Sequence, residues 1–159
     1  MADKYSLQEI VKFAIEIEKE GILFYSKISK KTENQGLKNI FLKLENDEEK
    51  HQKKFEEILE LLGPDKNEYL YHLENEYVAY LHSIIEKSVF DNEKIDQLIN
   101  NFKNDLDAIN YAISKEEDSI KFYENMKELT PKGNIPAINV IISEENLHIR
   151  DLLEIKANL

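Results

Sequence analysis

Apolar residues return every three or four positions along most of this chain, as they do on one face of an amphipathic α-helix. This spacing predicts four long helices, at about residues 7–31, 37–62, 105–129 and 134–157. Ser6 and Asn134 are predicted to cap the first and the last of these helices. Because only short breaks separate the first two and the last two helices, each pair should be antiparallel, giving helical hairpins at about 7–62 and 105–157.

A long connection, about residues 65–104, separates the two hairpins, and it is too long for a tight turn. Two further helices are predicted within it, one from Tyr69 to Lys87 and a shorter one that Asp91 could cap. The chain is therefore predicted to be a single all-α domain. Its architecture should be a four-helix bundle of two hairpins joined by a long, partly helical crossover.

Two polar residues interrupt the apolar stripe of the second helix. Leu44 precedes them and Phe55 follows them, but the heptad steps in between are Glu48 and His51. Side chains three residues apart point the same way on a helix, and these two point into the core. Burying either one unpaired costs roughly several kcal/mol. The stripe therefore indicates a bound partner, and a metal ion is the simplest candidate.

The two hairpins repeat each other in sequence. Residues 14–28 align without a gap on residues 112–126, and residues 41–51 align on residues 138–148. The alignment pairs four residues of the first hairpin with counterparts in the second, namely Glu18 with Glu116, Tyr25 with Tyr123, Glu48 with Glu145 and His51 with His148. Two such hairpins packed face to face would bring four carboxylates and two imidazoles to one level of the bundle.

This set matches the ligand pattern of di-iron and di-manganese proteins built on the ferritin-like bundle. The predicted metal ligands are Glu18, Glu48, His51, Glu116, Glu145 and His148. Carboxylates can bridge two ions, so Glu48 and Glu145 are the predicted bridges, whereas the other two carboxylates and the imidazoles bind one ion each. Tyr25 and Tyr123 are predicted to donate hydrogen bonds to carboxylates across the site and to shuttle protons. Two iron ions are expected, and manganese or zinc would suit the same ligands.

On these motifs, and on the crossover segment YVAYLHSIIEKSVF, the chain resembles the rubrerythrin family of the ferritin-like superfamily, in its small form without a rubredoxin domain. The resemblance covers nearly the whole chain. It implies a four-helix bundle with a di-iron centre that reduces hydrogen peroxide or dioxygen. Rubrerythrins also place an extra carboxylate about one turn past the third-helix Glu, where it helps one iron to change ligands. The matching position here is Ser119, and this departure argues against a ligand switch of that type.

Composition narrows the choice of partners and compartment. The 159 residues include no cysteine and carry a net charge of −11 at pH 7. A chain without cysteine holds no iron–sulfur module, so electrons would have to come from a separate donor, rubredoxin-like or similar. The negative charge argues against binding to nucleic acid or to an anionic membrane. The sequence shows no signal core and no apolar run of about 18 residues, so a cytoplasmic protein is expected.

The same site leaves several functions open. The first hypothesis is a di-iron oxidoreductase that reduces hydrogen peroxide, or dioxygen, to water, and a homodimer is expected. The alternatives are a ferroxidase or iron-storage protein, and a metal-dependent sensor without turnover. An oxygenase is disfavoured because the sequence identifies no substrate pocket.

The remaining candidate residues are predicted to have ordinary structural roles. His72 and His82 have no Glu three residues before them, so they are predicted to be surface or packing residues. Asp47 and Glu49 flank Glu48 and are predicted to lie on a solvated helix face.

Overall fold

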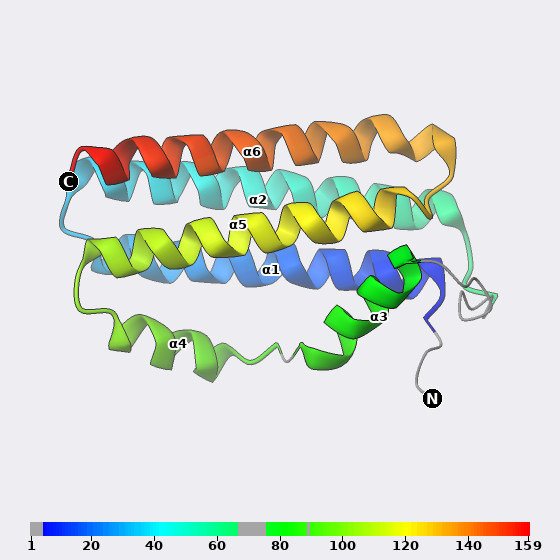
Figure 1. The fold of residues 1–159 in the computed structure, drawn as a ribbon, viewed down its shortest axis with the longest axis horizontal. Coiled ribbons are helices and arrows are strands. Elements are labelled where there is room, and N and C mark those ends of the chain that lie inside the picture. The colour runs from blue at the N-terminus through cyan, green and yellow to red at the C-terminus, as the bar shows by residue number, and fades with distance from the viewer. Residues whose placement is uncertain (1–4, 67–75, 89) are drawn as a thin grey trace.

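The structure is a computed structural model that describes residues 5–66, 76–88 and 90–159, and these residues form helices and no strand (Figure 1). Its helices, in chain order, are α1 (Leu7–Lys31), α2 (Gln35–Leu62), α3 (Glu76–Lys87), α4 (Asn92–Asn101), α5 (Asp105–Lys127), the short 3₁₀ turn η1 (Lys132–Asn134) and α6 (Ile135–Ala157). The predicted all-α bundle of two hairpins and a partly helical crossover is confirmed. The predicted crossover helix from Tyr69 begins outside the described residues, but its end at Lys87 is correct.

The four long helices run side by side, with α2 and α6 on one level and α1 and α5 on the next (Figure 1). α1 packs along α2 and α5 packs along α6, while contacts of α2 with α6 and of α1 with α5 join the two hairpins. The crossover helices α3 and α4 lie along the side formed by α1 and α5 (Figure 1). The chain thereby passes from one end of the bundle to the other, as the long crossover requires.

Side-chain caps fix the starts of most helices. The Ser6 hydroxyl accepts the backbone N–H of Glu9, and the Glu9 carboxylate accepts the backbone N–H of Ser6, which completes a capping box. Asn34 and Asp91 cap α2 and α4 through their side chains. The prediction that Asn134 caps α6 is wrong, because its side chain makes no capping hydrogen bond. Asn134 has helical backbone angles, since η1 runs directly into α6.

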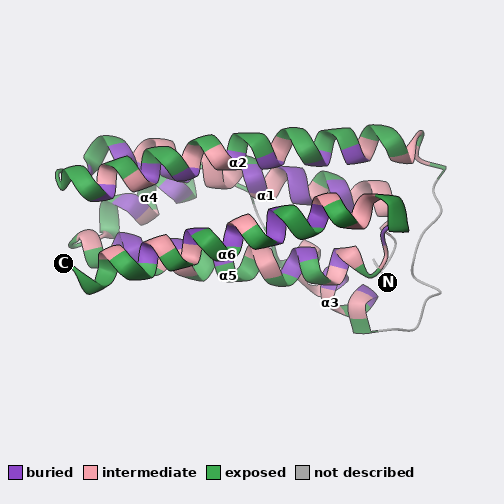
Figure 2. Cartoon of the chain, turned by 90° about the horizontal axis from the view of Figure 1, so that it is seen from above, coloured by how far each residue is buried: buried purple, intermediate pink, exposed green. Residues whose placement is uncertain are grey.

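The apolar core is divided into two clusters along the bundle. The first cluster, around Phe55 and Tyr123, draws on all four long helices and on Leu81 of α3. The second cluster, around Phe41 and Ile109, also draws on all four long helices and on α4. Figure 2 shows buried residues along the inward faces of all these helices. Leu106, in the first turn of α5, lies outside both clusters and is 40% exposed.

None of the helices in the described part of the chain is both long enough and apolar enough to cross a membrane.

Candidate metal centre

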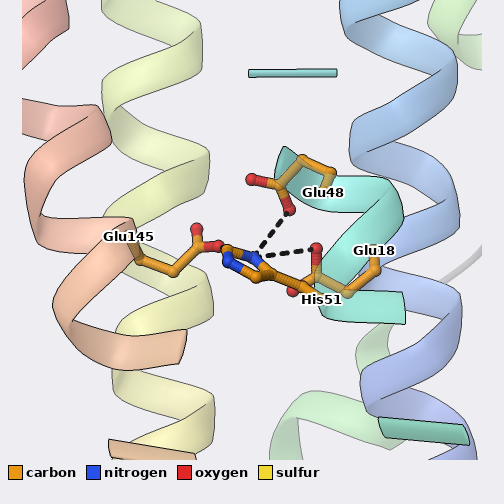
Figure 3. A group of neighbouring side chains, drawn as sticks. All are labelled: Glu18, Glu48, His51 and Glu145. Atoms are coloured by element: carbon orange, nitrogen blue, oxygen red, sulfur yellow. Dashed lines mark ion pairs between the residues drawn. The ribbon is translucent and has the colours of Figure 1, made fainter. Parts of the chain in front are cut away.

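Six polar side chains fill the space between the two apolar clusters. They are the six predicted metal ligands, Glu18 from α1, Glu48 and His51 from α2, Glu116 from α5, and Glu145 and His148 from α6. We call these six side chains the polar layer. Each of them is at most 4% exposed. Four side chains of this layer converge in Figure 3, where His51 lies between the carboxylates of Glu48, Glu18 and Glu145.

The polar layer divides into two overlapping groups of ligand atoms. One group consists of Glu18, Glu48, His51 and Glu145, and the other of Glu48, Glu116, Glu145 and His148. Within each group, one nitrogen or oxygen atom from every residue lies within 4.8 Å of all the others. Only Glu48 and Glu145 belong to both groups. The geometry is therefore that of two metal positions sharing two carboxylates.

Most inward-facing atoms of the polar layer have no hydrogen-bond partner in the part of the chain that is described. They include the Nδ1 atoms of both histidines and at least one oxygen of each of the four glutamates. His51 Nδ1 lies 2.6 Å from Glu145 Oε1 and 3.8 Å from Glu18 Oε2, without the geometry of a hydrogen bond. Buried polar atoms are nearly always satisfied in folded proteins. Oxygen and imidazole donors that converge in this way fit a pair of hard or borderline divalent cations.

The outer nitrogens of both histidines are bound by carboxylates that the sequence analysis missed. Nε2 of His51 lies 2.5 Å from Glu144 Oε2, and Nε2 of His148 lies 3.1 Å from Asp47 Oδ2. These contacts turn each Nδ1 toward the centre, so that Nδ1 is the atom free to bind a metal. Asp47 was predicted to lie on a solvated face, and it is instead partly buried. A signal was present, because the internal repeat pairs Asp47 with Glu144.

The two tyrosines of the repeat bind the carboxylates of the opposite hairpin. The Tyr25 hydroxyl donates to Glu116 Oε1 over 2.6 Å, and the Tyr123 hydroxyl donates to Glu18 Oε1 over 2.5 Å. Burial, and after it the nearby glutamates, raise the pKa of both tyrosines well above 10. Both hydroxyls therefore keep their protons and hold the two terminal carboxylates in place.

Burial and neighbouring groups shift the pKa values of the polar layer, upward for Glu18, Glu145 and His148 and downward for Glu48. Burial, followed by the charge of Glu48, raises the pKa of Glu18 well above its ordinary value. Burial, followed by Glu116 and Glu48, does the same for Glu145. Burial opposes ionisation of Glu48 as well, but contacts with Glu18 and both imidazoles lower its pKa. Burial also disfavours the charged imidazole, yet Glu116 and Glu48 raise the pKa of His148 to about 10.

No further carboxylate joins the layer from the turn after Glu116. Ser119 donates its hydroxyl to the backbone carbonyl of Lys115, while Glu117 and Asp118 are exposed on α5. Of the two crossover histidines, His72 lies outside the described residues. His82 is buried and packs edge-on against Tyr5, at a distance of 5.1 Å between ring centroids, as a packing residue would.

A cavity of about 440 Å³ adjoins the polar layer. Glu48 and Glu116 form part of its wall, and it extends past α1 and α5 to the end of α3 and the start of α4. The sequence alone identified no pocket of this kind. The sequence could not reveal this cavity, because its walls come from residues 13–122 of the chain, on five separate helices.

The chain and its fold have counterparts among known proteins. The sequence matches the family model described as rubrerythrin over residues 9–156. Curated proteins give no match. Among solved structures, the chain is similar to a ferritin-like diiron-carboxylate protein from Thermotoga maritima, with 25% sequence identity and a TM-score of 0.68. This similarity covers 97% of the present chain and 96% of the other.

Proposed function

The chain belongs to the rubrerythrin family, and on this premise we propose that it is a di-iron oxidoreductase that reduces hydrogen peroxide to water. The observation that carries the proposal is the convergence of unpartnered Glu oxygens and His nitrogens in two groups that share two carboxylates. The T. maritima protein, which resembles this chain over almost its full length, is of the diiron-carboxylate class, and this supports iron as the metal.

The residues of the polar layer have distinct roles in this proposal. Glu48 and Glu145 would bridge the two ions. Glu18 and His51 would complete one ion's ligands, and Glu116 and His148 the other's, as the two groups of atoms indicate. When bound, an iron pair supplies the redox chemistry, since two ferrous ions give up the two electrons that, with two protons, reduce hydrogen peroxide to two waters.

The surrounding side chains orient the ligands and handle protons. Tyr25 and Tyr123 each keep one oxygen of a terminal carboxylate occupied, so that the other oxygen faces the metal position. Asp47 and Glu144 hold the imidazoles from outside, which raises the basicity of the ligating nitrogens. Both tyrosine hydroxyls lie next to the centre, and in this proposal they relay protons to it while remaining protonated themselves.

Electrons are proposed to come from a separate protein. The chain contains no cysteine for an iron–sulfur module. A rubredoxin-like donor docking near the polar layer would meet this need.

Stopped-flow spectroscopy tests the reaction. We expect the ferrous protein to be oxidised faster by hydrogen peroxide than by dioxygen at equal concentration, with one peroxide consumed per metal pair. A rate with dioxygen equal to or above that with peroxide would overturn the assignment as a peroxidase. It would favour the ferroxidase alternative, which uses the same ligands.

Metal analysis tests the site separately from the reaction. We expect two metal ions per chain in the wild-type protein, and loss of both after Glu48→Ala or Glu145→Ala because each residue belongs to both ligand groups. Glu49→Ala is the matched control, since Glu49 is the exposed neighbour of Glu48 on the same helix. Unchanged metal content in the first two variants would refute the site.

A further inference from the structure

The cavity beside the polar layer is much larger than hydrogen peroxide requires. Peroxide has two heavy atoms, and a single water takes up about 30 Å³ in the liquid. The cavity measures about 440 Å³, within the range of roughly 300–1,000 Å³ that is usual for pockets that hold small organic molecules. Its volume therefore leaves room for a ligand larger than peroxide.

Small residues open the inner end of the cavity toward the polar layer. Gly21 lines it, and a Cβ atom at this position would lie 3.6 Å from Glu48 Oε2. Its counterpart in the internal repeat is Ser119, which also lines the cavity and has turned its hydroxyl back to Lys115 of its own helix. A larger side chain at either position would narrow the passage between the cavity and the metal centre.

Apolar side chains form the middle of the cavity. They include Phe13 and Ile17 of α1, Phe122 of α5 and Ile84 of α3. Phe13 packs against Phe122, with 5.1 Å between ring centroids. This wall suits a hydrocarbon chain, which gains roughly 0.8 kcal/mol for each methylene group that it buries.

Lysines line the cavity where α3 ends and α4 begins. Lys87 at the end of α3 and Lys94 on α4 both line it, and neither forms an ion pair with a described residue. Lys115 also lines it but lies 3.6 Å from Glu20, which offsets its charge. The other carboxylates of the wall are Asp118 and, beside the metal centre, Glu48 and Glu116. Two lysines of one cavity wall that lack an ion pair with a described residue are notable in a chain with a net charge of −11. They would favour an anionic head group.

We propose that this cavity binds an amphipathic organic anion, a carboxylate with a medium-length hydrocarbon chain. The carboxylate lies at Lys87 and Lys94, and the chain extends along Phe13 and Ile17 toward Gly21. The proposal does not depend on the peroxide reaction, since it concerns binding in a space that lies beside the metal ligands.

Isothermal titration calorimetry with octanoate, on the metal-loaded protein, tests the proposal. We expect saturable binding with one octanoate per chain. Acetate has the head group without the chain, and octanol has the chain without the charge, so both should bind at least tenfold more weakly. Absence of saturable octanoate binding would overturn the proposal. Equal affinity for acetate would do so too, because it would indicate a carboxylate bound directly to metal.

Charge reversal locates the head group. The double variant Lys87→Glu/Lys94→Glu should weaken octanoate binding at least tenfold. Lys30→Glu/Lys53→Glu is the matched control, because it makes the same change of charge at exposed lysines outside the wall of this cavity, and it should stay within twofold of wild type. An equal loss of octanoate affinity in both double variants would show that only the net charge of the protein matters. It would refute the assigned head-group position.

A change within the wall locates the hydrocarbon chain. Ile84→Trp should abolish octanoate binding by filling the cavity, whereas Ile85→Trp, at the neighbouring residue that does not line it, should retain binding. Thermal melts of both variants check that each remains folded. Undiminished binding in a folded Ile84→Trp variant would place octanoate elsewhere.

Discussion

Glu18 and Glu145 illustrate what burial does to a carboxylate that lacks a cation. Both are fully buried among other carboxylates, and burial followed by the neighbouring glutamates raises their pKa values well above the ordinary range. His148 is the converse case, because the carboxylates Glu116 and Glu48 hold its pKa at about 10 despite burial. In the metal-free protein, burial and the neighbouring carboxylates therefore favour the protonated form of all three groups. A metal ion needs the carboxylates ionised and the imidazole neutral.

Metal binding should therefore release protons. We expect protons to leave as the ions bind near pH 7, and the affinity to fall as the pH is lowered, because protons then compete more strongly for Glu18, Glu145 and His148. Calorimetric titration of the metal-free protein with Fe²⁺ or Mn²⁺, in two buffers of different ionisation enthalpy, counts these protons. Identical heats in the two buffers would contradict the expected release.

Asp47 and Glu144 lie outside both groups of ligand atoms, yet we expect both to support metal binding. Each holds the outer nitrogen of one histidine, so removing it frees the ring to rotate and lowers the basicity of Nδ1. Asp47→Ala or Glu144→Ala should weaken metal binding by about 10–100-fold. Competition with a chromogenic chelator measures the change. Glu49→Ala is the control, and affinities equal to that control would show that these carboxylates do not support the ligands.

The helices explain why so much of the site could be predicted. An exposed helix face tolerates almost any polar residue. Glu48, His51 and their counterparts in the internal repeat stand instead at heptad positions that must be buried, so the sequence pattern identified them as site residues. Asp47 stands one step outside the stripe, where a polar residue is ordinary. Its role depends on how closely α2 approaches α6, which the pattern within one helix does not record. The cavity depends on five helices at once and was not predictable for the same reason.

The N-caps of the helices also show what the sequence pattern could not predict, and this difference can be tested. Asn34 accepts the backbone N–H of Leu37 and caps α2, whereas Asn134 occupies the same position before α6 without a capping hydrogen bond. Asn34→Ala should therefore lower stability by about 1 kcal/mol, and the melting temperature by roughly 2–4 °C. Asn134→Ala should change the melting temperature by less than about 1 °C. Equal shifts in the two variants, measured by circular dichroism, would contradict the assigned caps.

The molecule as a whole is two apolar clusters with the polar layer between them. Each cluster spans all four long helices, and each includes one crossover helix, α3 in the first and α4 in the second. The break between α3 and α4 therefore falls over the polar layer, and the outer wall of the cavity lies there. Because either cluster can hold the four helices together, we expect the metal-free chain to keep its bundle. Its weakest level is the polar layer, where four carboxylates face one another without a cation.

Loading with metal should consequently raise stability without changing helix content. A ligand that binds only the folded state at 100 times its Kd contributes about 2.7 kcal/mol. For a chain of this length that is a rise of roughly 5–10 °C in melting temperature. Circular dichroism with and without a chelator measures both quantities, and Glu145→Ala is the control because it should melt at the same temperature in either condition. Loss of helicity on chelation would show that the apolar clusters do not maintain the bundle alone. An unchanged wild-type melting temperature would mean that no metal stabilises the polar layer.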